Sequence, residues 1–173
     1  MKLKTIFKLI IALVSVVALA SCLETVDHSV PKTHTYELSL LNEYIDSLHH
    51  RGLDVDTTAL GVYYVVDSEG NGPYPVTGDT CVIKYKGFLL DGGYYFDDSS
   101  LYNKTDSTFQ FVLGVGDYIP GWTDGMKVIN EGSLVYLIIP SNLAYGGEGN
   151  NYNIGPYETL IFQVDMVDIK QAY

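Results

Sequence analysis

The stretch FVLGVGDYIPGWTDG, residues 111–125, holds the one tryptophan of this 173-residue chain. Trp122 follows a Pro-Gly pair, which predicts a turn, and Trp122, Met126 and Ile129 then recur at the spacing of one face of a short helix. Before the turn, alternating apolar residues over 108–114 predict a strand. The simplest interpretation of the indole is that it packs in a hydrophobic core. The sequence on both sides indicates a second role.

Other segments rich in β-branched and aromatic residues predict further strands, and glycine- and proline-rich turns separate them. These segments lie at 62–66, 80–90, 133–140 and 159–169. We therefore expect an α+β domain with about five or six strands and one short helix, which is a common size for a single domain.

A separate amphipathic helix is predicted over residues 36–50, ahead of the strands. Four apolar residues recur there at helical spacing, and a glycine at position 52 is a suitable stop; the four are Leu38, Leu41, Ile45 and Leu48. We expect this helix to dock on its own domain, and binding to another chain is the alternative.

The first 21 residues have the layout of a bacterial export signal. Three lysines precede an apolar run at 9–20, which is too short for a comfortable membrane span. The run ends in LASC, which resembles a lipobox, so that Cys22 would be the lipid-carrying N-terminus of the mature protein. We accordingly divide the chain into a lipoprotein signal peptide (1–21), a tether (22–35), an N-terminal helical extension (36–60) and a folded domain (61–173).

The charge of the chain is strongly negative, with 10 basic and 21 acidic residues and a formal net charge of −11. Loss of 1–21 removes three lysines and no acid, which leaves 7 basic residues against 21 acidic ones and a net charge near −14. Such a surface repels phosphate backbones, which excludes nucleic acid as a partner. With Cys22 assigned to lipid, Cys81 is the one remaining cysteine, and its alternating surroundings predict a buried strand position.

The motifs of the commoner catalytic machineries are missing from this sequence. Residues 61–173 contain no histidine, because all four histidines lie upstream, so the usual imidazole base is absent. Asp97 with Asp98, and Asp117 with Asp124, lack the regular spacing of a calcium loop and are interpreted as solvated turn residues. We expect no metal and no cofactor, so any catalysis in this domain has to proceed without a nucleophile or a general base.

Six segments occur in the order found in one protein family and cover most of the chain from 72 to 169. They read GDTCVIKYKGFLLDG (78–92), FDDSS (96–100), FQFVLG (109–114), YIPGWTDGM (118–126), IPSNLAYG (139–146) and IGPYETLIFQV (154–164). In these segments the chain resembles the FKBP-type peptidyl-prolyl cis-trans isomerases. The resemblance implies an antiparallel sheet of about five or six strands curled around one short helix, preceded here by the N-terminal helix.

The resemblance also implies a proline-sized pocket whose floor is the indole of Trp122. The residues expected to act in catalysis are Asp97, Tyr145, Ile119 and Trp122, and those expected to bind substrate are Tyr85, Phe96, Phe109, Tyr118, Ile154 and Phe162. An X-Pro amide rotates over a barrier of about 18–20 kcal/mol. The main-chain N–H of Ile119 and the hydroxyl of Tyr145 would hold the peptide carbonyls while the apolar pocket favours the twisted amide.

The function implied by the resemblance is that of an enzyme, a lipid-anchored peptidyl-prolyl isomerase that assists the folding of exported proteins. It would lie in the bacterial cell envelope, at the outer membrane on its periplasmic or surface side. Its partners would be proline-containing polypeptides, a macrolide as a candidate pocket ligand, and the membrane through the lipid on Cys22. The alternative is a non-catalytic FKBP-like module that binds a protein partner or ligand at the envelope. A third interpretation is a structural lipoprotein whose residues 36–50 pair with another chain.

Overall fold

The computed structural model describes residues 32–150 and 152–172. The part of the chain from Lys32 onward is one compact unit, in which a long helix precedes a seven-stranded sheet and one short helix. The helices are α2 (His34–His50) and α3 (Pro120–Met126), with 3-10 turns η1 (Ser99–Leu101) and η2 (Ser141–Leu143). The strands are β1 (Asp56–Thr57), β2 (Tyr63–Ser68), β3 (Thr80–Leu89), β4 (Tyr95–Asp98), β5 (Phe109–Val112), β6 (Leu134–Ile139) and β7 (Leu160–Lys170).

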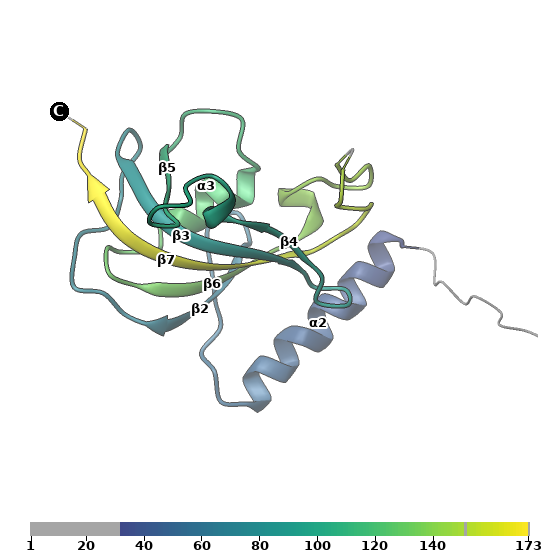
Figure 1. Ribbon diagram of the computed structural model, residues 1–173. Coiled ribbons are helices and arrows are strands. Elements are labelled where there is room, and N and C mark those ends of the chain that lie inside the picture. The colour runs from purple at the N-terminus through teal and green to yellow at the C-terminus, as the bar shows by residue number, and fades with distance from the viewer. Residues whose placement is uncertain (1–31, 151, 173) are drawn as a thin grey trace, which may run out of the picture. The chain divides into compact units, whose positions relative to one another are not determined.

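The strand order is β1-β2-β6-β7-β3-β4, with β5 paired to β3, and every pairing is antiparallel. One edge of β3 pairs with β7 from Thr80 to Leu89. The other edge is shared, because β5 pairs with Thr80–Ile83 and β4 pairs with Lys86–Phe88. This division leaves Lys84 and Tyr85 of β3 without a strand partner on that edge, between the segments paired with β5 and β4, and Figure 1 shows these two strands at different points along β3.

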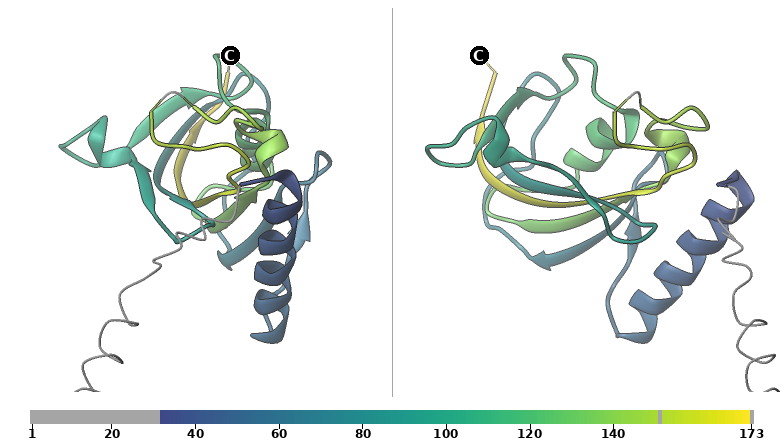
Figure 2. Two further views of the ribbon diagram at one scale, coloured as in Figure 1. Left: turned by 90° about the vertical axis from the view of Figure 1, so that its right-hand side faces the viewer. Right: turned by 45° about the vertical axis from the view of Figure 1, so that its right-hand side comes forward.

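The two faces of the curved sheet carry different helices, as the views in Figure 2 show. The short helix α3 lies on the concave face, where Trp122 and Met126 join the main hydrophobic core. Helix α2 packs on the opposite face, where Leu41 and Leu48 contact a smaller apolar cluster that includes Ile138.

Close approach of α3 to the sheet depends on two glycines of the helix. A Cβ added to Gly121 would clash with the side chain of Ile139, and one added to Gly125 would lie 2.7 Å from Cδ1 of Leu137. Both partners belong to β6. The sequence PGWTDGM therefore combines a proline, which is well tolerated at the start of a helix, with two positions that let the helix backbone rest on the sheet.

The predicted α+β class, with an antiparallel sheet curled around one short helix, is confirmed. Helix α3 is shorter than the predicted 122–129, because it ends at Met126, although Ile129 is fully buried with the same core. Helix α2 begins at His34, two residues inside the predicted tether, where the Thr33 hydroxyl caps it by accepting the N–H of Tyr36. The predicted signal peptide, Cys22 and most of the predicted tether lie outside the described residues.

Two further details differ from the sequence prediction. Leu38 was expected on the apolar face of the N-terminal helix, but it is 40 % exposed, and the neighbouring Glu37 is buried in its place. The second is the edge strand β1: the predicted helix over 36–50 ends at His50 as expected, and in the rest of the 36–60 extension Asp56 and Thr57 pair with β2.

Candidate functional site

The opening between β4 and β5 leaves the middle of β3 without a strand partner on that side. Tyr85 sits at this point, and its N–H donates to the hydroxyl oxygen of Ser99 at 3.1 Å. The Ser99 hydroxyl in turn donates to the carbonyl of Ser107 at 2.6 Å. A side chain from η1 thereby replaces a missing ladder hydrogen bond, and it fixes the backbone of Tyr85 without closing the opening.

A cavity of about 200 Å³ lies on the concave side of the sheet, beside α3. Its lining is mainly aromatic and comprises Tyr85, Phe96, Asp97, Tyr102, Phe109, Asp117, Tyr118, Ile119, Trp122, Tyr145 and Phe162. A preformed concave site with apolar walls and a few polar groups is typical of small-ligand binding.

Trp122 is among the most buried residues of the cavity lining, with 5 % of its surface exposed, and we call its indole the floor of the cavity. The rings of Tyr85 and Phe162 meet it edge-on, with centroids 5.2 Å and 5.0 Å away. Edge-to-face contacts of this kind hold an aromatic ring in one orientation. Nε1 of Trp122 is buried and has no hydrogen-bond partner among the described residues.

The carboxylate of Asp97 is the best-connected polar group at the cavity. Its Oδ2 accepts the hydroxyl of Tyr85 at 2.7 Å, and its Oδ1 accepts the N–H of Asp98 at 2.9 Å and the hydroxyl of Tyr102 at 3.4 Å. Burial, and then the hydrogen bond to Asp97, raise the pKa of Tyr85. Tyr85 therefore stays a neutral donor and holds the carboxylate in place.

Two hydrogen-bond donors lie at the rim of the cavity. Ile119 has an extended backbone and precedes the first turn of α3, and its N–H makes no hydrogen bond to another described residue. Tyr145 lies in the loop after η2 and is 39 % exposed. Burial, and then the negative charge of Asp97, raise the pKa of Tyr145, so its hydroxyl remains protonated. Both groups can donate to carbonyl oxygens of a bound chain.

The structure brings nine of the ten predicted pocket residues to this cavity. They are Asp97, Tyr145, Ile119, Trp122, Tyr85, Phe96, Phe109, Tyr118 and Phe162. Ile154 is the exception, since it is 3 % exposed, belongs to the core and is not part of the cavity lining. Its N–H is held by Oδ1 of Asn150 at 2.8 Å, which turns this part of the loop inward.

Sequence reasoning missed Tyr102 and Asp117 as cavity residues. The ring of Tyr102 lies 5.2 Å from that of Phe109 and extends the aromatic wall toward solvent. Asp117 immediately precedes Tyr118, and it was considered only as half of an acidic pair with Asp124. Its position next to the predicted pocket residues 118–119 was the one signal that could have placed it at the rim.

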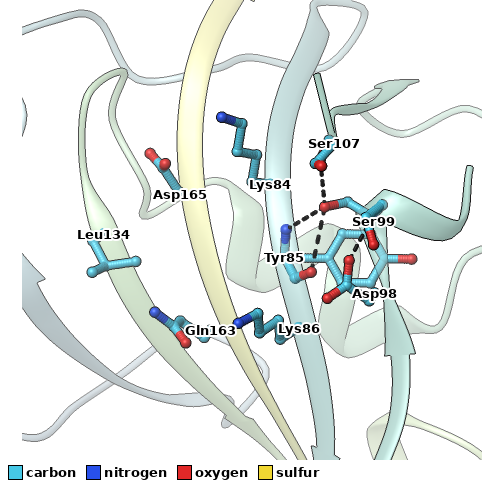
Figure 3. A pocket seen from close by; sticks show the side chains of 10 residues that line it. Lys84, Tyr85, Lys86, Asp98, Ser99, Ser107, Leu134, Gln163 and Asp165 are labelled. Atoms are coloured by element: carbon cyan, nitrogen blue, oxygen red, sulfur yellow. Dashed lines mark hydrogen bonds between the residues drawn. The ribbon is translucent and has the colours of Figure 1, made fainter. Parts of the chain in front are cut away.

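A wider hollow of about 450 Å³ lies on the outer face of the sheet. Figure 3 shows Lys84 and Lys86 of β3 beside Gln163 and Asp165 of β7. Its charged and polar lining does not suit a proline ring. Tyr85 lines both the hollow and the aromatic cavity: on the side of the hollow its N–H donates to the Ser99 hydroxyl, as Figure 3 shows, and its ring contributes to the cavity.

Fold and cavity together define an α+β protein with an aromatic cavity between a curled antiparallel sheet and a short helix. The sequence model of the FKBP-type peptidyl-prolyl cis-trans isomerase family matches residues 72–167. The chain belongs to this family.

Similar proteins agree with this assignment. The chain is 42 % identical over 118 residues to the FKBP-type peptidyl-prolyl cis-trans isomerase FkpA of Escherichia coli, which covers 68 % of this chain and 41 % of FkpA. It is 37 % identical over 112 residues to the outer membrane protein MIP of Legionella longbeachae, covering 65 % of this chain and 46 % of MIP. The crystal structure of E. coli FkpA superposes with a TM-score of 0.63 at 35 % identity, covering 80 % of this chain and 63 % of that one. The matched region thus spans less than half the length of these two relatives.

Proposed function

We propose that this protein is a peptidyl-prolyl cis-trans isomerase that acts on proline-containing polypeptides. The observation that carries this proposal is the aromatic cavity of about 200 Å³ with the indole of Trp122 as its floor. A proline ring on this floor would place its X-Pro bond beside the two rim donors, the N–H of Ile119 and the hydroxyl of Tyr145.

The chemistry requires no proton transfer and no covalent intermediate. Rotation of the X-Pro amide is slow because twisting removes its resonance, at a cost of about 18–20 kcal/mol. The twisted amide is less delocalised and less polar than the planar one. An aromatic cavity that excludes water from it therefore stabilises the transition state more than the ground state, which is the condition for catalysis.

The polar groups of the site have positioning roles in this mechanism. The N–H of Ile119 and the hydroxyl of Tyr145 hold carbonyl oxygens on either side of the rotating bond, so that one part of the peptide turns against a fixed part. Asp97 is held by Tyr85 at 2.7 Å and presents an ordered carboxylate at the rim. The absence of histidine from residues 61–173 is compatible with this mechanism, since no base is needed.

The N-terminal sequence supports a proposal for the cellular location. We propose that residues 1–21 direct export, that Cys22 carries lipid, and that the protein assists folding of exported proteins in the cell envelope. The relative named outer membrane protein MIP supports an envelope location. Among the described residues, no helix has the length and apolar character needed to cross a bilayer. Cys22→Ser should abolish partitioning into detergent, and unchanged partitioning would contradict the lipid anchor.

The isomerase activity is tested with a proline tetrapeptide whose cis-to-trans conversion is followed by NMR exchange. We expect acceleration that saturates with substrate and that a macrolide occupying the cavity inhibits. A protein that folds normally, binds a proline peptide and yet accelerates no X-Pro substrate would instead be a binding module of the same fold.

A further inference from the structure

The carboxylate of Glu37, in the first turn of α2, is buried against the rest of the protein. Only 3 % of this residue is exposed. Its Oε1 accepts the N–H of Ser141 at 2.6 Å and the hydroxyl of Thr159 at 2.8 Å, and its Oε2 accepts the hydroxyl of Ser141 at 2.5 Å. A buried carboxylate needs such donors, and here three of them come from outside the helix.

Ser141, the main partner of Glu37, also organises the turn that carries Tyr145. The carbonyl of Ser141 accepts the N–H of Ala144 at 2.9 Å and the N–H of Gly146 at 2.8 Å. The residues on both sides of Tyr145 are therefore bonded to Ser141, and Ser141 is bonded to Glu37 through its N–H and its hydroxyl. Ser141 therefore holds the backbone on both sides of Tyr145, the residue whose hydroxyl is a donor at the cavity rim.

Thr159, the second anchor, immediately precedes β7 and ends the loop that begins after Tyr145. One carboxylate consequently holds the segment 141–159 at both of its ends. Inside this segment the N–H of Tyr157 donates to the carbonyl of Gly146 at 2.8 Å, which closes the loop on itself.

The turn that begins at Ser141 also touches the helix that carries the cavity floor. A Cβ added to Gly121 would lie 3.1 Å from the carbonyl oxygen of Leu143 and 3.2 Å from its Cβ. Gly121 directly precedes Trp122. A continuous set of contacts thus leads from Glu37 through the turn at 141–143 to the indole.

We propose that Glu37 is a positioning residue of the isomerase site, which fixes the rim hydroxyl of Tyr145 and the floor of Trp122 through Ser141 and Thr159. In this proposal helix α2 contributes to the geometry of the site and does more than connect the N-terminal region to the domain. This inference rests on the proposed isomerase function. The inference requires that removal of the Glu37 carboxylate changes the site more than weakened docking of helix α2 alone does.

The test compares three variants of the full-length protein. Glu37→Leu removes all the acceptor contacts, and Glu37→Gln keeps one oxygen that can still accept from Ser141 and Thr159. Leu48→Ala is the matched control, because Leu48 is 3 % exposed and anchors the other end of the same helix against Val65 and Ile138. All measurements are made well below the unfolding temperature of each variant.

For Glu37→Leu we expect kcat/KM on a proline tetrapeptide to fall about three- to tenfold, mainly through a raised KM, since the rim is misplaced. Glu37→Gln should fall between this variant and the wild type. Leu48→Ala should keep wild-type kinetics although it lowers the unfolding temperature. Amide exchange at Ala144 and Gly146 should accelerate about tenfold or more in Glu37→Leu and not in Leu48→Ala.

Equal kcat/KM and equal amide exchange in Glu37→Leu and Leu48→Ala would overturn the inference. A wild-type protein without isomerase activity would overturn the proposed function instead. In that case the exchange at Ala144 and Gly146 still decides whether Glu37 holds the loop, so the two failures are distinguishable.

Discussion

The hydroxyl of Tyr85 donates a hydrogen bond of 2.7 Å to Oδ2 of Asp97, and this one tyrosine joins the floor of the cavity to its rim. Its ring meets Trp122 edge-on at 5.2 Å between centroids, while its phenol orients the carboxylate. The placement of Asp97 therefore depends on the same side chain that fixes the indole.

Substitutions at Tyr85 and Asp97 should have non-additive effects on kcat/KM. Tyr85→Phe removes the donor from the carboxylate, and we expect kcat/KM to fall up to about tenfold, the equivalent of a hydrogen bond worth about 0.5–1.5 kcal/mol. Asp97→Ala should cause a similar loss, and the double variant should lose less than the two losses combined, since both break one bond. Measuring kcat/KM of the wild type, the two single variants and the double variant completes the double-mutant cycle. Fully additive losses would contradict this role of the Tyr85–Asp97 bond.

The single indole allows a direct test of the cavity floor. A proline-containing peptide should change the emission of Trp122 saturably, with one binding site. Trp122→Leu should keep the fold and weaken binding in calorimetry, because leucine fills part of the space but lacks a flat face. Trp122→Phe is the matched control, since it retains an aromatic face and removes the unpartnered Nε1. Weaker binding by the phenylalanine variant than by the leucine variant would argue against the indole as a platform.

Local patterns were sufficient to predict much of the fold, whereas the resemblance to a family was needed to select the residues around the cavity. The alternation of Phe109 and Phe111 predicted a strand, and the spacing of Trp122 and Met126 predicted a short helix; β5 and α3 confirm both. The Pro-Gly pair, predicted as a turn ahead of the helix, instead forms the first two residues of α3. Cys81 is fully buried in β3, as its alternating surroundings predicted. These signals are short-range, so the sequence displays them directly.

The features that the sequence did not show depend on distant partners or on loop geometry. Glu37 is separated from Ser141 and Thr159 by 104 and 122 positions, so no local pattern distinguishes it from a solvated helix residue. Ile154 turns into the core because Oδ1 of Asn150 accepts its N–H together with the N–H groups of the two preceding residues. Side-chain hydrogen bonds of this kind decide where a loop residue points.

The rim hydroxyl of Tyr145 can be removed with little effect on folding. Tyr145→Phe should lower kcat/KM up to about tenfold, because one hydrogen bond to a substrate carbonyl is lost. The unfolding temperature should hardly change, since the side chain is 39 % exposed. Tyr152→Phe is the control, because Tyr152 lies in the same loop and is 93 % exposed. Equal rates for these two variants would contradict a role of the Tyr145 hydroxyl in catalysis.

The thiol of Cys81 should be unreactive in the folded protein. Its side chain is fully buried, and burial, followed by the negative charge of Asp79, raises its pKa to about 11. In a Cys22→Ser background, where Cys81 is the one thiol, modification at pH 8 should be slow, and denaturant should accelerate it by about a hundredfold or more. Rapid labelling of the native protein with loss of isomerase activity would indicate a working thiol instead.

Because folding favours the ionised form of Glu37, the free energy of unfolding should fall as the solution is made acidic. Burial alone would raise the pKa of Glu37, but the hydrogen bonds from Ser141, Thr159 and His34 outweigh it, so the pKa lies below its ordinary value. The folded state therefore binds this proton more weakly than the unfolded state, where a glutamate titrates near about 4.3. The resulting stabilisation is fully present above about pH 5 and is lost as the pH falls through the folded pKa.

Urea unfolding of the wild type and of Glu37→Gln from pH 7 to pH 3 measures this contribution. We expect the variant to be less stable at pH 7 and to lose less stability than the wild type as the solution is acidified, because it has no carboxylate to protonate at this position. The ionisable groups around position 37 are the same in both proteins; they are Lys32, His34, Tyr36, Asp91, Tyr157 and Glu158. The difference between the two stability curves therefore isolates Glu37. Parallel curves would mean that folding does not favour the ionised carboxylate, and the hydrogen bonds from Ser141 and Thr159 would then not stabilise its charge.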